Sequence, residues 1–272
     1  MTTLQQKRDQ LLEQLRSYRS CAVAFSAGVD STVVAKAAQL ALGEQAVAVT
    51  GTSASLAAGE LEQAIELAEE IGIRHTVLQT EEFDDPNYLR NAPDRCFHCK
   101  DEHYRQLEKH IDQLGVDVVV NGANYDDRGD YRPGMKAAEQ HQVHSPLLDC
   151  EFTKDEVRQL AAQWQLPVWD KPATPCLSSR VAYGEEVTPD RLAMIDAAES
   201  FLRQNGFPIV RVRYHRGDLA RVEVPVENLV ELLASPFRQR LTSHLREVGF
   251  RFISIDIEGF RSGNLNQLIQ LQ

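Results

Sequence analysis

The sequence has no apolar run long enough to cross a membrane, since no stretch approaches the roughly 20 residues that a spanning helix needs. It also lacks an excess of basic residues: 29 lysines and arginines stand against 40 aspartates and glutamates, a net charge of −11. Such a chain has no global positive field, which disfavours tight nonspecific binding to nucleic acid. We therefore expect neither a membrane protein nor a nucleic-acid-binding one.

The sequence has few cysteines, 5 in 272 residues, and an odd number of them cannot all pair within one chain. The first ten residues, MTTLQQKRDQ, show no charged segment followed by an apolar one, as a secretory signal would. Both features favour a cytoplasmic protein, in which clustered cysteines suggest metal binding or catalysis before disulfides. Cys21 and Cys150 stand apart from any cluster and are interpreted as small core residues.

The length predicts one large domain and a smaller one. Short β-branched runs alternate with helical patterns, which indicates repeated βαβ units and an α/β fold with a doubly wound parallel sheet. Strands are expected at residues 21–25, 45–50, 74–78 and 116–121, with residues 143–147 as a further candidate. One helix should end at Gly72, and a capping box of Thr153 and Glu156 should start another near residue 154.

A long loop is predicted at about residues 167–186, where the periodicity is lost and prolines gather. Thr188 then begins a helix that should end at Asn205 and Gly206. The rest of the chain is predicted to form strands in IVRVRYH, ARVEV and FISIDI, with a helical stretch at residues 229–248. We expect residues 1–188 to form the sheet domain and residues 189–272 a small α+β domain.

A glycine-bearing turn, SAGVDS, joins the first predicted strand to a helix at residues 26–31. Backbone N–H groups at a helix N-terminus bind phosphate oxygens, and Ser26 and Ser31 add hydroxyl donors. Asp30 either shares Mg²⁺ with a polyphosphate or accepts N–H bonds from the loop. No Walker lysine or GxGxxG pattern is present, which disfavours γ-phosphate transfer and hydride chemistry. An ordinary capped turn is the alternative, but the place after the first strand favours a pyrophosphate site.

Cys96 and Cys99 lie at the start of a predicted helix, where the helix dipole lowers thiol pKa values. Cys176 lies in the long loop. Three thiolates can hold a [4Fe-4S] cluster with one iron open to a small ligand. A zinc site with His98 or His103 as fourth ligand, and thiols without any metal, are the alternatives.

Arg211 and Arg213 alternate on one face of a predicted strand, and Arg180 ends the cysteine-bearing loop. Two arginines so spaced can grip one phosphate or carboxylate. A salt bridge with Glu223 or Glu227 is the alternative for any single arginine, whereas the three together favour anion binding.

The turn resembles the SGGxDS pyrophosphate loop of the ATP pyrophosphatase family, whose members split ATP between the α and β phosphates. Ala27 stands where that family usually has a second glycine, and a positive φ there would cost about 1 kcal/mol. Six motifs, in order, are similar to those of LarE-type ATP-dependent sulfur transferases of nickel-pincer nucleotide synthesis: SAGVDSTVVAKAA, NAPDRCFHCK, DYRPGMKAA, PCLSSRVAYGEEVT, GFPIVRVRYH and EGFRSGNLNQ. The resemblance covers residues 23–266.

The resemblance implies an adenine nucleotide α-hydrolase-like fold, with a PP-loop domain at residues 1–188 and a substrate-binding domain at residues 189–272. It implies a set of ATP-binding residues, with Asp30 also on Mg²⁺ and the adenine near Thr50: Ser26, Gly28, Asp30, Ser31, Thr50 and Arg132. It implies a second set that binds the substrate's phosphate and carboxylates: Arg180, Glu199, Arg211, Arg213 and Arg261.

The implied reaction adenylates a carboxylate of pyridinium-3,5-biscarboxylic acid mononucleotide, and sulfur then displaces AMP to give a thiocarboxylate. Some relatives sacrifice the single loop cysteine, whereas others carry the Cys-x-x-Cys pair and use a cluster. Cys96, Cys99 and Cys176 favour the second group and are the implied catalytic residues and cluster ligands. We also expect a homo-oligomer and partners in cofactor assembly. The alternatives are a tRNA thiolase and a non-catalytic nucleotide-binding module with structural zinc.

Overall fold

The computed structural model describes residues 3–129, 133–172 and 174–261, which form two compact units. The first unit contains Met1–Ser53, Gly59–Glu82 and Cys96–Thr174, and the second contains Ala54–Ala58, Phe83–Arg95 and Pro175–Gln272. The second unit thus includes two short segments from the first half of the chain, Ala54–Ala58 and Phe83–Arg95, together with residues 175–188. The functional division at residue 188 stays a prediction.

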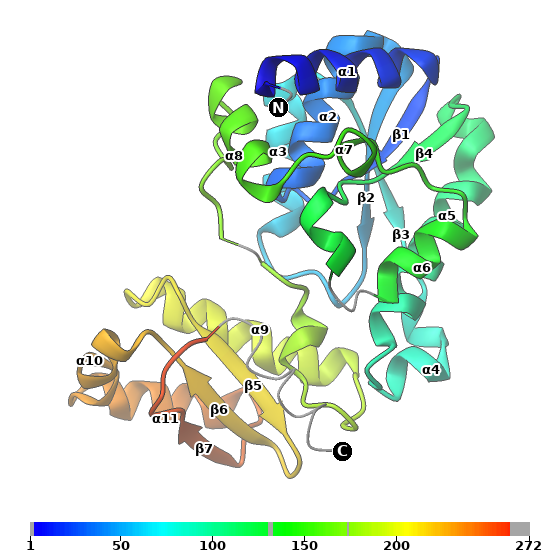
Figure 1. Ribbon diagram of the computed structural model, residues 1–272. Coiled ribbons are helices and arrows are strands. Elements are labelled where there is room, and N and C mark those ends of the chain that lie inside the picture. The colour runs from blue at the N-terminus through cyan, green and yellow to red at the C-terminus, as the bar shows by residue number, and fades with distance from the viewer. Residues whose placement is uncertain (1–2, 130–132, 173, 262–272) are drawn as a thin grey trace. The chain divides into compact units, whose positions relative to one another are not determined.

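A sheet of four parallel strands, in the order β3-β2-β1-β4, is the centre of the first unit (Figure 1). Val23 in β1 aligns with Ala48 in β2 and with Val120 in β4. The strands are β1 (Cys21–Ala24), β2 (Ala46–Thr52), β3 (Arg74–Gln79) and β4 (Val118–Val120). The prediction of four parallel strands in an α/β fold is therefore confirmed.

Helices cover both faces of this sheet because both sets of alternating strand residues are apolar. On one face Val23 and Ala48 pack in a core with α2, α3 and α8. On the other face Ala22 and Val49 pack in a core with α5 and α6. The helices are α1 (Leu4–Ser17), α2 (Val29–Leu42), α3 (Glu60–Ile71), α5 (Arg95–Leu114), α6 (Pro133–Gln140), α7 (Pro146–Asp149) and α8 (Lys154–Gln163), with 3₁₀ turns η1 (Gly43–Gln45) and η3 (Tyr125–Gly129).

The predicted helix ends are present in the first unit. Gly72 caps α3 in the left-handed conformation at φ 76°, and Thr153 and Glu156 form the capping box of α8. The additional strand at residues 143–147 is wrong. His144 makes only an isolated bridge with Val120, and Pro146, which has no N–H to give to a ladder, instead starts α7.

The second unit is built on a mixed sheet in the order β5-β6-β7. β5 (Arg211–His215) and β6 (Leu219–Glu223) are antiparallel, and β7 (Phe252–Ile255) is parallel to β6. Helix α9 (Pro189–Gln204) packs against β5 and α11 (Phe237–Glu247). Smaller elements are η2 (Glu82–Asp84) at the boundary of the units, α4 (Pro86–Leu89), η4 (Leu177–Arg180), η5 (Val226–Asn228) and α10 (Leu229–Leu233).

Thr188 caps α9 by accepting a hydrogen bond from the Arg191 N–H, and Asn205 ends the helix, as predicted. The helical stretch predicted at residues 229–248 is instead two helices, α10 and α11. Pro236 lies at the break, because a proline inside a helix removes a backbone donor and clashes with the preceding turn. Within the described ranges, no helix combines the length and the apolar character needed to cross a bilayer.

Candidate functional site

The turn after β1 presents backbone donors at the start of α2. Gly28 is the N-cap residue, with extended backbone (φ −83°, ψ 159°), and no described side chain caps the helix. The Ser31 hydroxyl donates to the Gly28 carbonyl at 3.1 Å and lies 3.2 Å from the Ser26 hydroxyl. Thr32 donates to the same carbonyl at 2.8 Å. The hydroxyl groups therefore hold the turn in shape while the first N–H groups of α2 remain available to an anion.

Ala27 adopts the left-handed conformation, with φ 52°. An alanine costs about 1 kcal/mol there relative to glycine. Its methyl group is only 1% exposed and packs in the core beside α2. Burial of one methyl group contributes roughly 0.8 kcal/mol, which offsets most of the strain. An alanine is thus compatible with this turn.

A cavity of about 440 Å³ lies at the carboxyl ends of β1 and β4. The chain order of the sheet reverses between these two strands, so the loops that follow them diverge and leave a crevice. The turn contributes Ser26, Gly28, Asp30 and Ser31, and the segment after β4 contributes Asn121, Gly122 and Ala123. The volume is within the range of about 300–1,000 Å³ that is typical of small-molecule sites.

Gly122 lets the segment after β4 approach the turn closely. A Cβ at this position would lie 2.7 Å from the backbone nitrogen of Ser31 and 3.0 Å from the carbonyl carbon of Asp30. Both neighbours are backbone atoms and have little room to move. Glycine is therefore required to keep the present shape of this wall.

Helix α5 forms a further wall of the cavity. Cys96, Lys100 and Tyr104, which recur at every fourth residue and share one face of the helix, all line it. Cys96 is exposed, whereas Cys99, one turn further along, is half-buried. The structure thus brings the turn after β1 and the first cysteine of the Cys-x-x-Cys pair into one cavity.

Asp30 is held at both carboxylate oxygens. Lys154 Nζ lies 2.5 Å from Asp30 Oδ2, and Asn124 Nδ2 donates to Oδ1 at 3.2 Å. The carboxylate faces the cavity and is of the ligand type that Mg²⁺ prefers. Among the described residues, however, no group of three or more His, Cys, Asp or Glu side chains is arranged to hold a metal ion.

Thr50 is buried at the end of β2, where its hydroxyl donates to the Phe25 carbonyl at 3.0 Å and lies 2.9 Å from His75 Nε2. Burial raises the pKa of Cys21 to about 12. Burial and the neighbouring Asp149 raise the pKa of Cys150 to about 11. Neither thiol is ionised at neutral pH, as expected of cysteines without a reactive role.

His103, one of the two alternative zinc ligands, lies beside the end of β2: a Cβ on Gly51 would be only 2.4 Å from its Nδ1. Burial and the charge of Lys100 lower the pKa of His103 to about 3, which keeps the imidazole neutral. Arg132, predicted to contact ATP, lies outside the described residues.

In the second unit, Arg180 is 1% exposed and pairs with the fully buried Glu199, with 3.1 Å between Nε and Oε1. Glu199 also accepts bonds from Arg203 at 3.1 Å and from the Val212 N–H at 3.0 Å. Arg180 Nη1 donates to the carbonyls of Pro175 and Cys176. Arg180 therefore holds the loop that carries Cys176.

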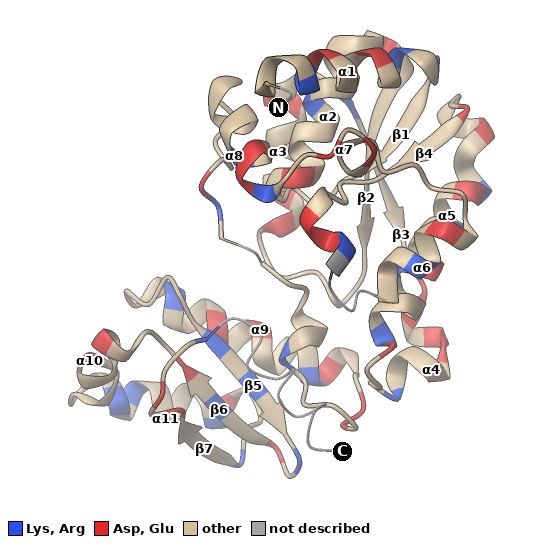
Figure 2. Cartoon of the chain, viewed as in Figure 1, with Lys and Arg blue, Asp and Glu red and all other residues tan. Residues whose placement is uncertain are grey.

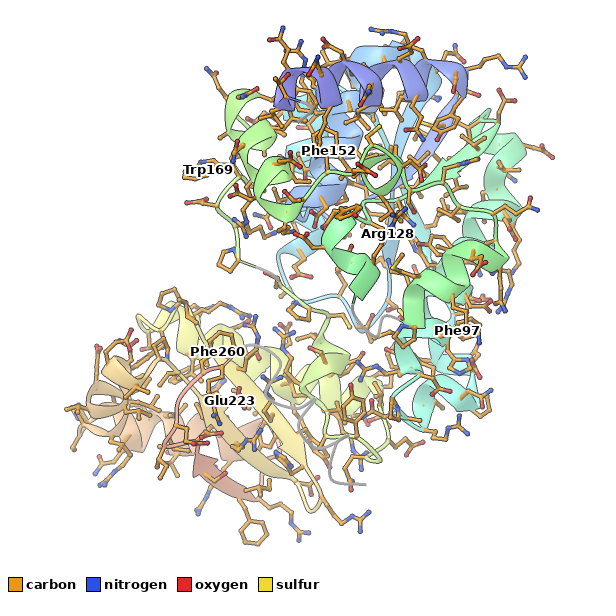
Figure 3. The ribbon with its side chains drawn as sticks, viewed as in Figure 1. Phe97, Arg128, Phe152, Trp169, Glu223 and Phe260 are labelled. Carbon is orange, nitrogen blue, oxygen red and sulfur yellow. The ribbon has the colours of Figure 1, made fainter. Side chains whose placement is uncertain are left out.

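Arg211 and Arg213 lie on the same strand, β5, which carries basic residues in Figure 2. Their partners differ, and two of these partners, Phe260 and Glu223, are labelled in Figure 3. Arg213 pairs with the fully buried Glu223 at 2.9 Å. Arg211 lies over the Phe260 ring, 5.3 Å from its centre, and no described carboxylate forms an ion pair with it. Burial and the nearby charge of Arg180 lower the pKa of Arg211 to about 10, although the charge of Glu199 acts in the opposite direction.

The last predicted substrate residue, Arg261, is exposed and lies 2.5 Å from Glu258. The second unit therefore contains all five predicted substrate residues: Arg180, Glu199, Arg211, Arg213 and Arg261. The first unit contains the described residues predicted to bind ATP, together with Cys96 and Cys99.

Comparison with known proteins places the chain in a family. Residues 5–103 match the family model described as asparagine synthase. The uncharacterized protein slr1717 of Synechocystis is 43% identical over 262 residues, which cover 95% of this chain and 97% of that protein. The pyridinium-3,5-bisthiocarboxylic acid mononucleotide synthase of Lactiplantibacillus plantarum is 37% identical over 270 residues, which cover 99% of this chain and 97% of the synthase. The chain belongs to this synthase family.

The expectations of a PP-loop fold and of an enzyme of the LarE type are thereby confirmed. More distant similarity extends to the glutamine-hydrolysing GMP synthase of Aeropyrum pernix, 28% identical over 207 residues, which cover 66% of this chain and 38% of that enzyme. The likeness covers only part of each chain, whereas that to the synthase family is nearly complete.

Five residues at or beside the cavity of this synthase-family chain were not predicted from the sequence: Lys100, Asn121, Gly122 and Asp127, which line it, and Lys154, which pairs with Asp30. Two signals were present. Lys100 directly follows the cysteine pair, and the NGAN segment follows the fourth predicted strand at its carboxyl end, where ligands gather. Lys154 gave no signal, because the first residue of a capped helix is an ordinary surface position.

Proposed function

We propose that the chain is an ATP-dependent sulfur transferase that adenylates a carboxylate of pyridinium-3,5-biscarboxylic acid mononucleotide and converts it to a thiocarboxylate for nickel-pincer cofactor synthesis. The observation that carries the proposal is the shared cavity of the phosphate-binding turn and Cys96. A nucleotide site and an exposed thiol in one cavity suit a reaction in which adenylation precedes sulfur transfer. The 37% identity with a synthase named for the thiocarboxylate product supports the choice of substrate.

In the first step a carboxylate oxygen of the substrate attacks the α-phosphorus of ATP. The bond from this phosphorus to the oxygen that bridges to the β-phosphorus breaks, and pyrophosphate leaves. The N–H groups at the start of α2, together with Lys100, stabilise the charge that develops on pyrophosphate. Asp30 would hold Mg²⁺, which would supply further neutralisation. The product is an acyl adenylate, whose AMP is a far better leaving group than the oxide of a free carboxylate.

In the second step a sulfur nucleophile attacks the activated carbonyl carbon and AMP departs with the bonding electrons. A [4Fe-4S] cluster on Cys96, Cys99 and Cys176 would supply this sulfur as sulfide. Cys96 and Cys99, one helical turn apart in the first unit, would give two thiolate ligands, and Cys176, which belongs to the second unit, would give the third. In the alternative, the Cys176 thiolate attacks, and elimination then breaks its Cβ–S bond to leave dehydroalanine.

The substrate's anionic groups are assigned to the second unit. Arg211 is the strongest candidate, because its charge has no carboxylate partner among the described residues. Arg180 and Arg213 are committed to Glu199 and Glu223, so we assign them to holding the loop and the strand around the substrate. An arginine without a counterion is a suitable partner for phosphate.

The test is a Cys96→Ser variant purified without oxygen, beside the wild type and a Cys150→Ser control. We expect the wild type to contain iron and acid-labile sulfide and to release pyrophosphate from ATP only with the pyridinium acid. Cys96→Ser should lose the brown colour and at least 90% of thiocarboxylate formation, roughly a tenfold effect. Cys150→Ser should keep both, because the Cys150 thiol only donates to Gln14.

Each other outcome has a defined meaning. Activity retained in Cys96→Ser, with no product from Cys176→Ser and with Cys176 of the wild type converted to dehydroalanine after one turnover, identifies the sacrificial route. Absence of pyrophosphate release with every carboxylate tried, with zinc in place of iron, contradicts the enzymatic proposal. Tight binding of bulk tRNA in a gel shift would instead favour tRNA thiolation, which a chain of net charge −11 disfavours.

A further inference from the structure

Tyr104 brings a neutral hydroxyl group to the wall of the cavity. This tyrosine of α5 lines the cavity, yet it is only 3% exposed and packs in the core between α5 and the sheet. Its ring is held from two sides, since the ring of His141 lies 6.0 Å away and the ammonium of Lys100 lies 5.9 Å from the ring centre. The packing of the ring therefore fixes the place of the hydroxyl group.

The side-chain amide of Asn121, directly after β4, can take only one orientation. Its Oδ1 accepts from the Ala123 N–H and from the Ser145 hydroxyl, both at 3.0 Å. A backbone N–H can only donate, so the amide atom that faces it must be the oxygen. The amide nitrogen, Nδ2, then faces the phenolic oxygen of Tyr104 at 3.4 Å.

This orientation decides which of the two groups donates. An amide nitrogen only donates, so the phenolic oxygen of Tyr104 accepts the bond from Asn121. The single proton of the phenol must then point away from Asn121. Among the residues that the structure describes, no atom accepts this proton, whereas both side chains line the cavity. A molecule in the cavity can therefore supply the acceptor.

The serine hydroxyls of the turn after β1 donate within the turn. Ser31 gives its proton to the Gly28 carbonyl, so the contact of 3.2 Å between the two serine hydroxyls is a bond from Ser26 to Ser31. Of the hydroxyl groups that the structure describes in the cavity wall, the one left to donate to a ligand is that of Tyr104.

A hydroxyl group with a proton to donate suits an anionic oxygen, which accepts hydrogen bonds from several donors at once. Two further donors serve the same cavity: the N-terminus of α2 and Lys100, whose ammonium lies over the Tyr104 ring. The anion that these donors can share is the pyrophosphate part of ATP.

We propose that the Tyr104 hydroxyl donates a hydrogen bond to the pyrophosphate part of ATP and that Asn121 orients the hydroxyl for this bond. Asn121 does so by occupying a lone pair of the phenolic oxygen, which leaves the proton facing the cavity. The bond strengthens as negative charge develops on the departing pyrophosphate. The proposal rests on the nucleotide-binding step of the proposed function and is independent of the source of sulfur.

The experiment compares Tyr104→Phe, which removes only the hydroxyl, with the matched control Tyr18→Phe. The Tyr18 hydroxyl also accepts from a side-chain amide, that of Gln14 at 2.8 Å, but Tyr18 is not among the residues that line the cavity. Calorimetry on the full chain measures the affinities for pyrophosphate with Mg²⁺ and for AMP. Tyr104→Phe should bind pyrophosphate roughly 10 to 100 times more weakly, and AMP within about threefold of the wild type, because one bond to a charged acceptor is lost. Tyr18→Phe should match the wild type with both ligands.

Asn121→Asp tests whether the amide orients the hydroxyl. Its carboxylate can still accept from Ala123 and Ser145, but the second oxygen now accepts from Tyr104 and draws the phenolic proton away from the cavity. In the Asn121→Asp background, Tyr104→Phe should therefore change the affinity for pyrophosphate by less than about twofold. The added negative charge is present in both members of this comparison and cancels.

Three results would overturn the proposal. The first is an affinity for pyrophosphate in Tyr104→Phe within about threefold of the wild type. The second is an equal loss of affinity for AMP, which indicates a distorted cavity. The third is an equal effect of Tyr104→Phe with and without Asn121→Asp. A wild type that shows the expected pattern of binding but never forms thiocarboxylate refutes the proposed function and leaves this proposal intact.

Discussion

Replacement of Gly122 by alanine should damage the nucleotide site through a single steric contact. The new Cβ would lie 2.7 Å from the Ser31 nitrogen, whereas ordinary contacts begin at 3.4 Å, so the two segments must separate by about 0.7 Å. Overpacking of this kind costs about 1–3 kcal/mol, which corresponds to a decrease of roughly 2–12 °C in Tm.

The effect on nucleotide binding should be larger than the effect on folding. A shift of this size lengthens each hydrogen bond from the turn to phosphate beyond its useful range. One lost bond to a charged group is worth about 1.5–3 kcal/mol, so the affinity for ATP should fall roughly 10- to 100-fold. Calorimetric titration with ATP and Mg²⁺, together with a thermal scan, measures both quantities.

Gly134→Ala is the matched control because it adds the same methyl group to the same cavity. Its Cβ would lie 3.1 Å from Lys100 Cγ, in a flexible side chain that can give way, and Gly134 is in a helix, where alanine is favoured. ATP affinity should stay within about threefold of the wild type and Tm should not fall. Equal affinities and equal Tm values in the two variants would refute the idea that close approach at Gly122 shapes the turn.

Two further predictions concern stability. His141 lies 3.0 Å from Asp101 and 2.9 Å from Glu108; although burial lowers the pKa of His141, the hydrogen bonds to these carboxylates raise it above its ordinary value overall. The stability that this cluster adds should be complete below a pH of about 6.5, the ordinary pKa of histidine, and should be lost as the pH rises through the higher pKa of the folded state. His141→Gln should therefore flatten the decline in Tm between about pH 6 and 9. An unchanged pH profile of Tm would contradict the assignment. Arg180→Met should lower the free energy of unfolding, measured by denaturant titration, by about 3–5 kcal/mol, because it leaves Glu199 buried without its main partner. Addition of Glu199→Gln should recover part of that loss. Additive effects of the two substitutions would show that the pair does not interact.

Much of the fold could be predicted because the signals are local. The strands β1, β2 and β4 are short apolar runs between helices, and the caps at Gly72 and Thr153 depend on residues a few positions apart. Such patterns follow directly from backbone geometry and helix capping. The same logic failed at residues 143–147 (VHSPL), because the proline at position 146 cannot donate a hydrogen bond to a neighbouring strand and instead starts α7.

The phosphate-binding turn could be predicted from sequence, but its surroundings could not. Ser26, Gly28, Asp30 and Ser31 are consecutive or nearly so, and their order after a strand indicates their chemistry. Lys154 reaches Asp30 across 124 positions of sequence, and Gly122 is important only because Ser31 lies against it. Contacts of this kind depend on the order of strands in the sheet, which no local pattern contains.

The buried charges of the second unit are better explained by positioning than by stability. A buried ion pair adds little net stability, because desolvation of both charges offsets their attraction. Here Glu199 joins Arg180 to the Val212 N–H in β5, and Arg180 binds the Cys176 carbonyl at 2.9 Å. The network therefore fixes the loop of Cys176 relative to the strand of Arg211, whose charge has no carboxylate partner among the described residues. A thiol and an arginine held in fixed register suit the proposed transfer of sulfur to a substrate anchored by its phosphate.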